Sequence, residues 1–131
     1  TRYYEQTVCF SNPESVAALY MERMRHLDTE HIYLVLTDTK NRFMKEILIS
    51  KGTVNSSLLS VREIFVEALR YQAVNILLLH NHPSGDSTPS REDIVITSQI
   101  LKASRLLNIP LLDHIIIGDN TFTSLKEKGY L

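Results

Sequence analysis

The chain has 131 residues, a formal net charge of −1, and 44% hydrophobic and 22% charged residues. This composition is ordinary for one soluble globular domain, and a chain of this length buries a substantial core without disulfides or structural metals. Lys and Arg are spread along both halves, which disfavours a protein that holds nucleic acid mainly through phosphate contacts, and no apolar segment approaches the roughly 20 residues that span a bilayer.

The first 28 residues are predicted to form an N-terminal segment and a helix that packs on the rest of a single domain, residues 1–131. The chain begins at Thr1 and not at Met, so we expect it to be a piece of a longer protein. Cys9 is the single cysteine, which excludes an internal disulfide and suits a reducing, cytoplasmic compartment. In Ser11–Glu14 (SNPE), a capping Ser or Asn precedes Pro and Glu, which predicts a helix start.

The next elements are a hairpin, a helix and a buried strand. Residues 31–37 (HIYLVLT) and 43–52 (FMKEILISKG) are predicted strands on either side of a polar turn. A second amphipathic helix is marked by four apolar residues at helical spacing, Val61, Ile64, Phe65 and Ala68. Residues 75–80 (NILLLH) form a continuous apolar run, which predicts a central strand covered on both faces.

The last third of the chain is predicted to hold a helix over Arg91–Leu107, a buried strand over 111–117 (LLDHIII) and a short strand over 121–125. Alternating helices and strands indicate an α/β or α+β layered domain with helices packed on a mixed sheet. Asp113 and His114 are neighbours in a strand, so they face opposite ways, and we interpret them as satisfied polar groups.

Two histidines one residue apart, His80 and His82, end the central apolar strand. If the backbone stays extended that far, both imidazoles point to the same side, which favours a zinc site. A catalytic zinc usually has three protein ligands and keeps a fourth position for water. We expect Asp93, in the first turn of the next helix, to be the third ligand, because the turn-forming loop before it can fold back. Asp86 competes for this role, but it lies in mid-loop, where no rigid element aims it.

Each of these residues also has a plain structural interpretation. A histidine at a strand end is commonly a polar cap, and Ser90 with Asp93 three residues later resembles a helix-capping arrangement. All four residues at this spacing, directly after a buried strand, nevertheless favour a metal site.

His80-Asn81-His82, followed at fixed spacing by Ser90 and Asp93, is similar to the H-x-H-x7-S-x2-D signature of the JAMM (MPN) metalloprotease superfamily. The stretches HNHPSGD, PSRED and LLDHIIIGD resemble the bacterial RadC branch of that superfamily. The resemblance implies that His80, His82 and Asp93 bind Zn²⁺. It also implies that the Ser90 hydroxyl hydrogen-bonds the bound water or the developing oxyanion.

The resemblance covers the chain from about Glu30 to Leu131. It implies an α/β domain with three α/β/α layers and a mixed sheet, of the MPN and cytidine deaminase-like type. It further implies a glutamate general base near the start of the first strand of the domain. Glu30 holds that place, and Glu46, in the second strand, is the rival.

The function that the resemblance implies is a zinc-dependent hydrolase, a metallopeptidase in which zinc-activated water cleaves a peptide or isopeptide bond. The alternative is a non-catalytic zinc-binding module of a larger RadC protein associated with DNA repair. We expect a peptide or protein substrate, no membrane partner, and nucleic-acid binding only through regions outside this chain.

Overall fold

The computed structural model describes residues 8–52 and 59–131, so the start of the predicted N-terminal segment lies outside the described residues. A five-stranded sheet in the order β2-β1-β3-β4-β5 forms the middle layer. β3 and β4 are parallel and the other neighbouring pairs are antiparallel, so the sheet is mixed, as predicted. The strands are β1 (Glu30–Thr37), β2 (Phe43–Gly52), β3 (Asn75–Asn81), β4 (Leu111–Ile117) and β5 (Phe122–Ser124).

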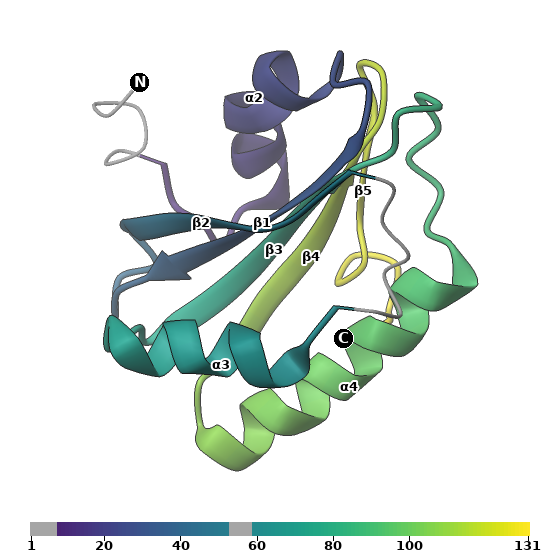
Figure 1. Ribbon diagram of the computed structural model, residues 1–131. Coiled ribbons are helices and arrows are strands. Elements are labelled where there is room, and N and C mark those ends of the chain that lie inside the picture. Colours follow the sequence, from purple (N-terminus) through teal and green to yellow (C-terminus); the bar gives the residue numbers. More distant parts are fainter. Residues whose placement is uncertain (1–7, 53–58) are drawn as a thin grey trace.

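Helices cover both faces of this sheet (Figure 1). α2 (Pro13–Met24) lies on one face, while α3 (Val61–Arg70) and α4 (Arg91–Leu107) lie on the other. The predicted three-layer α/β/α architecture is therefore confirmed. No helix in the described parts of the chain combines the length and the apolar content that crossing a membrane requires.

Side-chain alternation along the strands divides the core into two layers. In β1, Ile32 and Leu34 pack toward α3 and α4, whereas Val35 packs toward α2. All residues of β3 are buried because helices cover both of its sides, which explains its uninterrupted apolar sequence. The parity of a residue in its strand thus decides which helical layer it meets.

Local capping signals set where the helices begin. Asn12 caps α2 with its side-chain oxygen, and Pro13 occupies the first turn. Ser60 caps α3 in the same manner. α4 begins with a complete capping box between Ser90 and Asp93, which satisfies two otherwise unpaired backbone donors.

The loop of residues 82–90 joins β3 to α4 and is held against the turn between β4 and β5. The amide of Asp119 donates to the carbonyl of Gly85 at 2.8 Å, and the two backbones pass very close to each other. A Cβ on Gly118 would lie 2.3 Å from the Gly85 carbonyl oxygen, so only glycine fits at position 118. This contact fixes the loop that carries His82 on one side and Ser90 on the other.

Candidate metal centre

The two histidines lie together at the end of β3. Their rings meet edge to face with centroids 4.9 Å apart. β3 ends at Asn81, but the amide of His82 still donates to the carbonyl of Ile117 at 2.9 Å, so strand-like pairing extends to the second histidine. Both imidazoles therefore lie on one side of the strand, as their spacing predicts.

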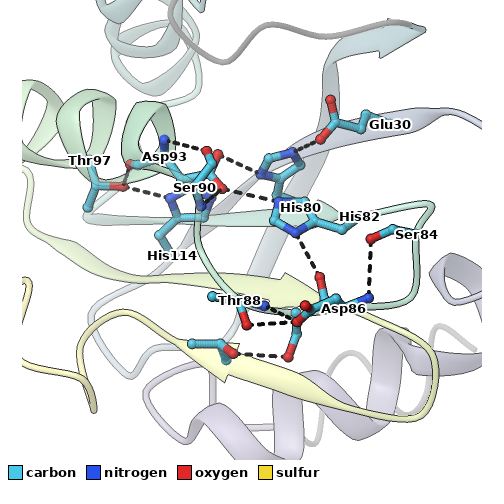
Figure 2. A network of polar contacts seen from close by, with 12 residues as sticks. Glu30, His80, His82, Ser84, Asp86, Thr88, Ser90, Asp93, Thr97 and His114 are labelled. Atoms are coloured by element: carbon cyan, nitrogen blue, oxygen red, sulfur yellow. Dashed lines mark hydrogen bonds and ion pairs between the residues drawn. The ribbon is translucent and has the colours of Figure 1, made fainter.

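The loop after β3 brings Asp93 back onto both rings (Figure 2). Asp93 Oδ2 lies 3.1 Å from His82 Nε2, and Asp93 Oδ1 lies 3.4 Å from His80 Nδ1. The same carboxylate accepts a hydrogen bond from the Ser90 amide at 2.9 Å, while the Asp93 amide donates to Ser90 Oγ at 3.0 Å. The capping arrangement and the contact with the histidines thus coexist in one side chain.

The charges in this cluster reinforce one another. Burial opposes ionisation of Asp93, but the hydrogen bond with His82, the charge of His80 and the Ser90 amide outweigh it, so the pKa of Asp93 lies well below its usual value. The pKa of His82 is raised, chiefly by its hydrogen bond to Asp93, against the opposing effect of burial. Asp93 is consequently an anion held beside two imidazoles.

Glu30, the first residue of β1, contacts the cluster at Nε2 of His80, whereas Nδ1 of the same ring lies toward Asp93. Its Oε1 atom lies 2.9 Å from His80 Nε2, and its side chain is 22% exposed. Glu30 has the same parity in β1 as Ile32, which packs toward α3 and α4, and His80 has the same parity in β3 as Leu78. Strand register therefore brings the two side chains to one face.

Glu30, His80 and His82 together offer one ligand atom each within 4.8 Å of one another, an arrangement that could hold a metal ion. This group contains the predicted general base, whereas Asp93 contacts the two histidines from outside the group. The His80 ring accounts for the difference, because it directs Nε2 to Glu30 and Nδ1 toward Asp93. Both histidines thus belong to the group that could hold a metal ion, and both also contact Asp93.

The two rival carboxylates are engaged elsewhere. Glu46 pairs with Val35 in the sheet, on the α2 side, and its Oε1 atom accepts hydrogen bonds from Tyr20 and Arg23. The Asp86 carboxylate accepts from the amide and hydroxyl of Thr88 within the loop (Figure 2). Only the backbone carbonyl of Asp86 meets the cluster, where it lies 2.9 Å from His82 Nδ1.

His114, which the sequence led us to interpret as a satisfied polar group, is a buried neighbour of the cluster. Its ring lies beside that of His80, with centroids 5.7 Å apart and planes at 23°. The Thr97 hydroxyl donates to the Asp93 carbonyl at 2.6 Å, so it accepts from His114 Nδ1 at 2.7 Å. Burial lowers the pKa of His114 to about 3, which keeps the ring neutral.

The feature that places His114 near His80 is the pairing of their two strands. β4 lies beside β3, where His114 pairs with Leu78, two residues before His80. Asp113 faces the other way, as predicted, and its carboxylate accepts from the Ser124 hydroxyl and the Lys126 amide. The interpretation as satisfied polar groups therefore holds for Asp113 and is incomplete for His114, whose Nε2 atom is buried without a hydrogen-bond partner.

Comparison with known proteins adds an independent finding. The model of the RadC-like JAB domain family matches residues 10–130. The UPF0758 protein of Desulforamulus reducens is 51% identical over 127 residues, which are 97% of this chain and 56% of that protein. The UPF0758 protein of Bacillus cereus strain ZK is 47% identical over 128 residues, which are 98% of this chain and 57% of that protein.

The chain accordingly spans little more than half the length of these curated relatives. The family match covers nearly all of the chain, including both histidines, Ser90, Asp93 and Glu30. By this match and these identities, the chain belongs to the RadC-like JAB domain family.

Proposed function

We propose that this chain is a zinc-dependent hydrolase domain that cleaves a peptide or isopeptide bond. His80, His82 and Asp93 would hold the zinc, and Glu30 and Ser90 would act on the reacting atoms. Two imidazole nitrogens and one carboxylate oxygen form a donor set typical of catalytic zinc.

The observation that carries this proposal is the contact between His82 and Asp93. His82 Nδ1 faces the carbonyl oxygen of Asp86, which can only accept, so Nδ1 carries the proton of the neutral ring. The lone pair of Nε2 then points at the Asp93 carboxylate, 3.1 Å away. The Nε2 lone pair and the carboxylate oxygen are both acceptors, so a cation must lie between or beside them. Either a proton or a metal ion can be that cation.

A second observation fits the same metal. His80 Nδ1 is buried and has no hydrogen-bond partner, although it lies 3.4 Å from Asp93 Oδ1. A proton on Nδ1 that points at Asp93 would satisfy this nitrogen and leave Nε2, the nitrogen beside Glu30, to bind the metal. Zinc bound by these groups would polarise the scissile carbonyl and lower the pKa of a bound water toward about 7.

Glu30 is suited to move protons, because it is partly exposed and contacts the cluster through a single oxygen. It would take the proton of the attacking water as the oxygen–carbon bond forms, and deliver it to the amine nitrogen as the carbon–nitrogen bond breaks. Ser90 Oγ accepts from the Asp93 amide, so its own proton is available for the developing oxyanion. The products are a carboxylate and an amine.

A metal-dependent cleavage screen tests this function. The chain would be stripped with a chelator, reloaded with zinc and incubated with a library of quenched fluorogenic peptides. We expect about one zinc per chain and cleavage that the chelator abolishes. His82→Ala and Asp93→Ala should lose both metal and cleavage. Glu92→Ala is the matched control, because Glu92 is the exposed neighbour of Asp93 in the same helical turn.

Failure to bind zinc that is supplied would contradict the proposed function. Stoichiometric zinc without cleavage of any library peptide would instead favour the non-catalytic zinc-binding module. Inactive protein with bound zinc and inactive protein without zinc are therefore distinct outcomes.

A further inference from the structure

The asparagine between the two histidines makes contacts that have no part in the proposed reaction as described above. Asn81 is buried, with 1% of its surface exposed, at the last position of β3. Its Oδ1 atom accepts a hydrogen bond from the His31 amide at 2.6 Å. Its Nδ2 atom donates to the carbonyl of Thr29 at 3.1 Å. These two backbone groups belong to the residues on either side of Glu30.

The hydrogen bonds of the Asn81 side chain lie just beyond the last paired residues of β1 and β3. The pairing of β1 with β3 ends at Ile32 and His80, and two residues later the amide of His82 donates to the carbonyl of Ile117 in β4. Without another partner, the backbone around Glu30 would leave the sheet edge unpaired at this point. The Asn81 amide takes over the pairing by one donated and one accepted bond.

We propose that Asn81 is a positioning residue for Glu30, holding its backbone so that the carboxylate stays in contact with His80. An amide side chain suits this role because its oxygen accepts from the His31 amide while its nitrogen donates to the Thr29 carbonyl. A carboxylate at position 81 could accept from the His31 amide but could not donate to the Thr29 carbonyl. The catalytic consequence rests on the proposed hydrolase function, whereas the positioning does not.

Position 75, at the opposite end of the same strand, provides a matched control. Asn75 is also largely buried, and its Nδ2 atom donates to the carbonyl of Asp38 and to Asn41 Oδ1, just beyond the far end of β1. Both asparagines thus join an end of β3 to the chain around an end of β1 through their amides. Loss of either should weaken the fold, but only loss of Asn81 should disturb Glu30.

The first measurement uses the metal-free chain, so that it does not depend on zinc or on activity. Imidazole ¹⁵N spectra would report the contact between His80 and Glu30 in wild type, Asn81→Ala, Asn75→Ala and Glu30→Gln. Glu30→Gln defines the displacement of the His80 ring signals when the carboxylate is replaced. We expect Asn81→Ala to reproduce most of that displacement and Asn75→Ala to leave the signals at their wild-type positions.

The second measurement separates positioning from binding in the zinc-loaded chain, with a peptide that the wild type cleaves. Asn81→Ala should lower kcat by tenfold to about 100-fold, as expected for a displaced catalytic group, with zinc content and KM close to wild type. Asn75→Ala should keep the wild-type kcat at temperatures where it is folded. If Asn81→Ala does not fold, Asn81→Leu, which keeps a similar side-chain volume without any hydrogen-bonding group, provides the same comparison with Asn75→Leu as its control.

Wild-type His80 signals in a folded Asn81 variant would overturn the inference. So would equal displacement of these signals by the Asn75 variant, because the effect would then be a general loss of stability. If no variant, wild type included, cleaves any peptide, the proposed hydrolase function fails, and the metal-free spectra still decide whether Asn81 positions Glu30.

Discussion

His82 Nε2 lies 3.1 Å from Asp93 Oδ2, while His82 Nδ1 lies 2.9 Å from the carbonyl oxygen of Asp86. Both partners accept hydrogen bonds, so the metal-free arrangement favours a ring that is protonated on both nitrogens. This is the physical cause of the raised pKa of His82. A metal ion and a proton then compete for the same nitrogen.

Zinc affinity is therefore expected to depend steeply on pH. Metal binding requires neutral His82, and the raised pKa extends proton competition to higher pH than for an ordinary histidine. Below that pKa, each decrease of one pH unit should weaken the apparent zinc affinity by about tenfold for each competing proton. Competition with a chelator of known affinity, between about pH 5.5 and about pH 8, measures this slope. An affinity that stays constant over this range would show that His82 does not bind the metal.

The stability of the metal-free chain should fall as the pH rises above 6.5, the ordinary pKa of histidine. The folded pKa of His82 is raised, so its contribution is fully present below 6.5 and is lost as the pH passes through the folded pKa. His114 acts in the opposite direction below 6.5, because its folded pKa of about 3 lets the unfolded chain bind the extra proton. Stability without metal should thus be greatest near pH 6.5.

Urea unfolding in the presence of a chelator tests this profile. His82→Gln should remove the decline above 6.5, and His26→Gln, at an exposed position, should keep it. Unchanged decline in His82→Gln would contradict the assignment. Zinc at 100 times its Kd should raise the free energy of unfolding by about 2.7 kcal/mol in the wild type.

Glu30→Gln and Glu46→Gln should have opposite effects on activity and stability. Glu30→Gln keeps the shape of the side chain but cannot accept the proton of water, so cleavage should fall by about 100-fold or more while zinc stays bound. Glu46→Gln replaces the carboxylate that accepts from Tyr20 and Arg23, so it should cost about 1 kcal/mol of stability and leave zinc-dependent cleavage intact. Retained cleavage in Glu30→Gln would remove Glu30 from the reaction.

The elements next to the site follow closely from local sequence. The predicted helix Arg91–Leu107 has the same bounds in the structure, because the Ser90 cap and the αL residue Asn108 define its two ends. The spacing of His80 and His82 sufficed to place both rings on one side of β3, since strand alternation is a local property.

The pairing of strands that are far apart in the chain does not follow from local sequence. Residue spacing alone did not separate Glu30 from its rival Glu46, and Glu30 was preferred only through the family resemblance. The pairing of β1 with β2 and β3 shows that Glu30 faces His80 and that Glu46 faces α2. The position of His114 beside His80 likewise depends on β4 being the parallel neighbour of β3, a consequence of topology.

The Thr97 hydroxyl links His114 to the backbone of Asp93, and its removal should weaken metal binding. Thr97→Val keeps the volume of the side chain but leaves His114 Nδ1 without its acceptor in a buried setting, which should cost about 1–3 kcal/mol of stability. Loss of an orienting partner behind metal ligands typically weakens metal affinity by about tenfold to 100-fold. Thr97→Ser keeps the hydroxyl, so its zinc affinity should stay close to wild type even though it loses a buried methyl group. Chelator competition on the two variants distinguishes these cases, and equal affinities would show that the Thr97–His114 pair supports the fold but does not orient the ligands.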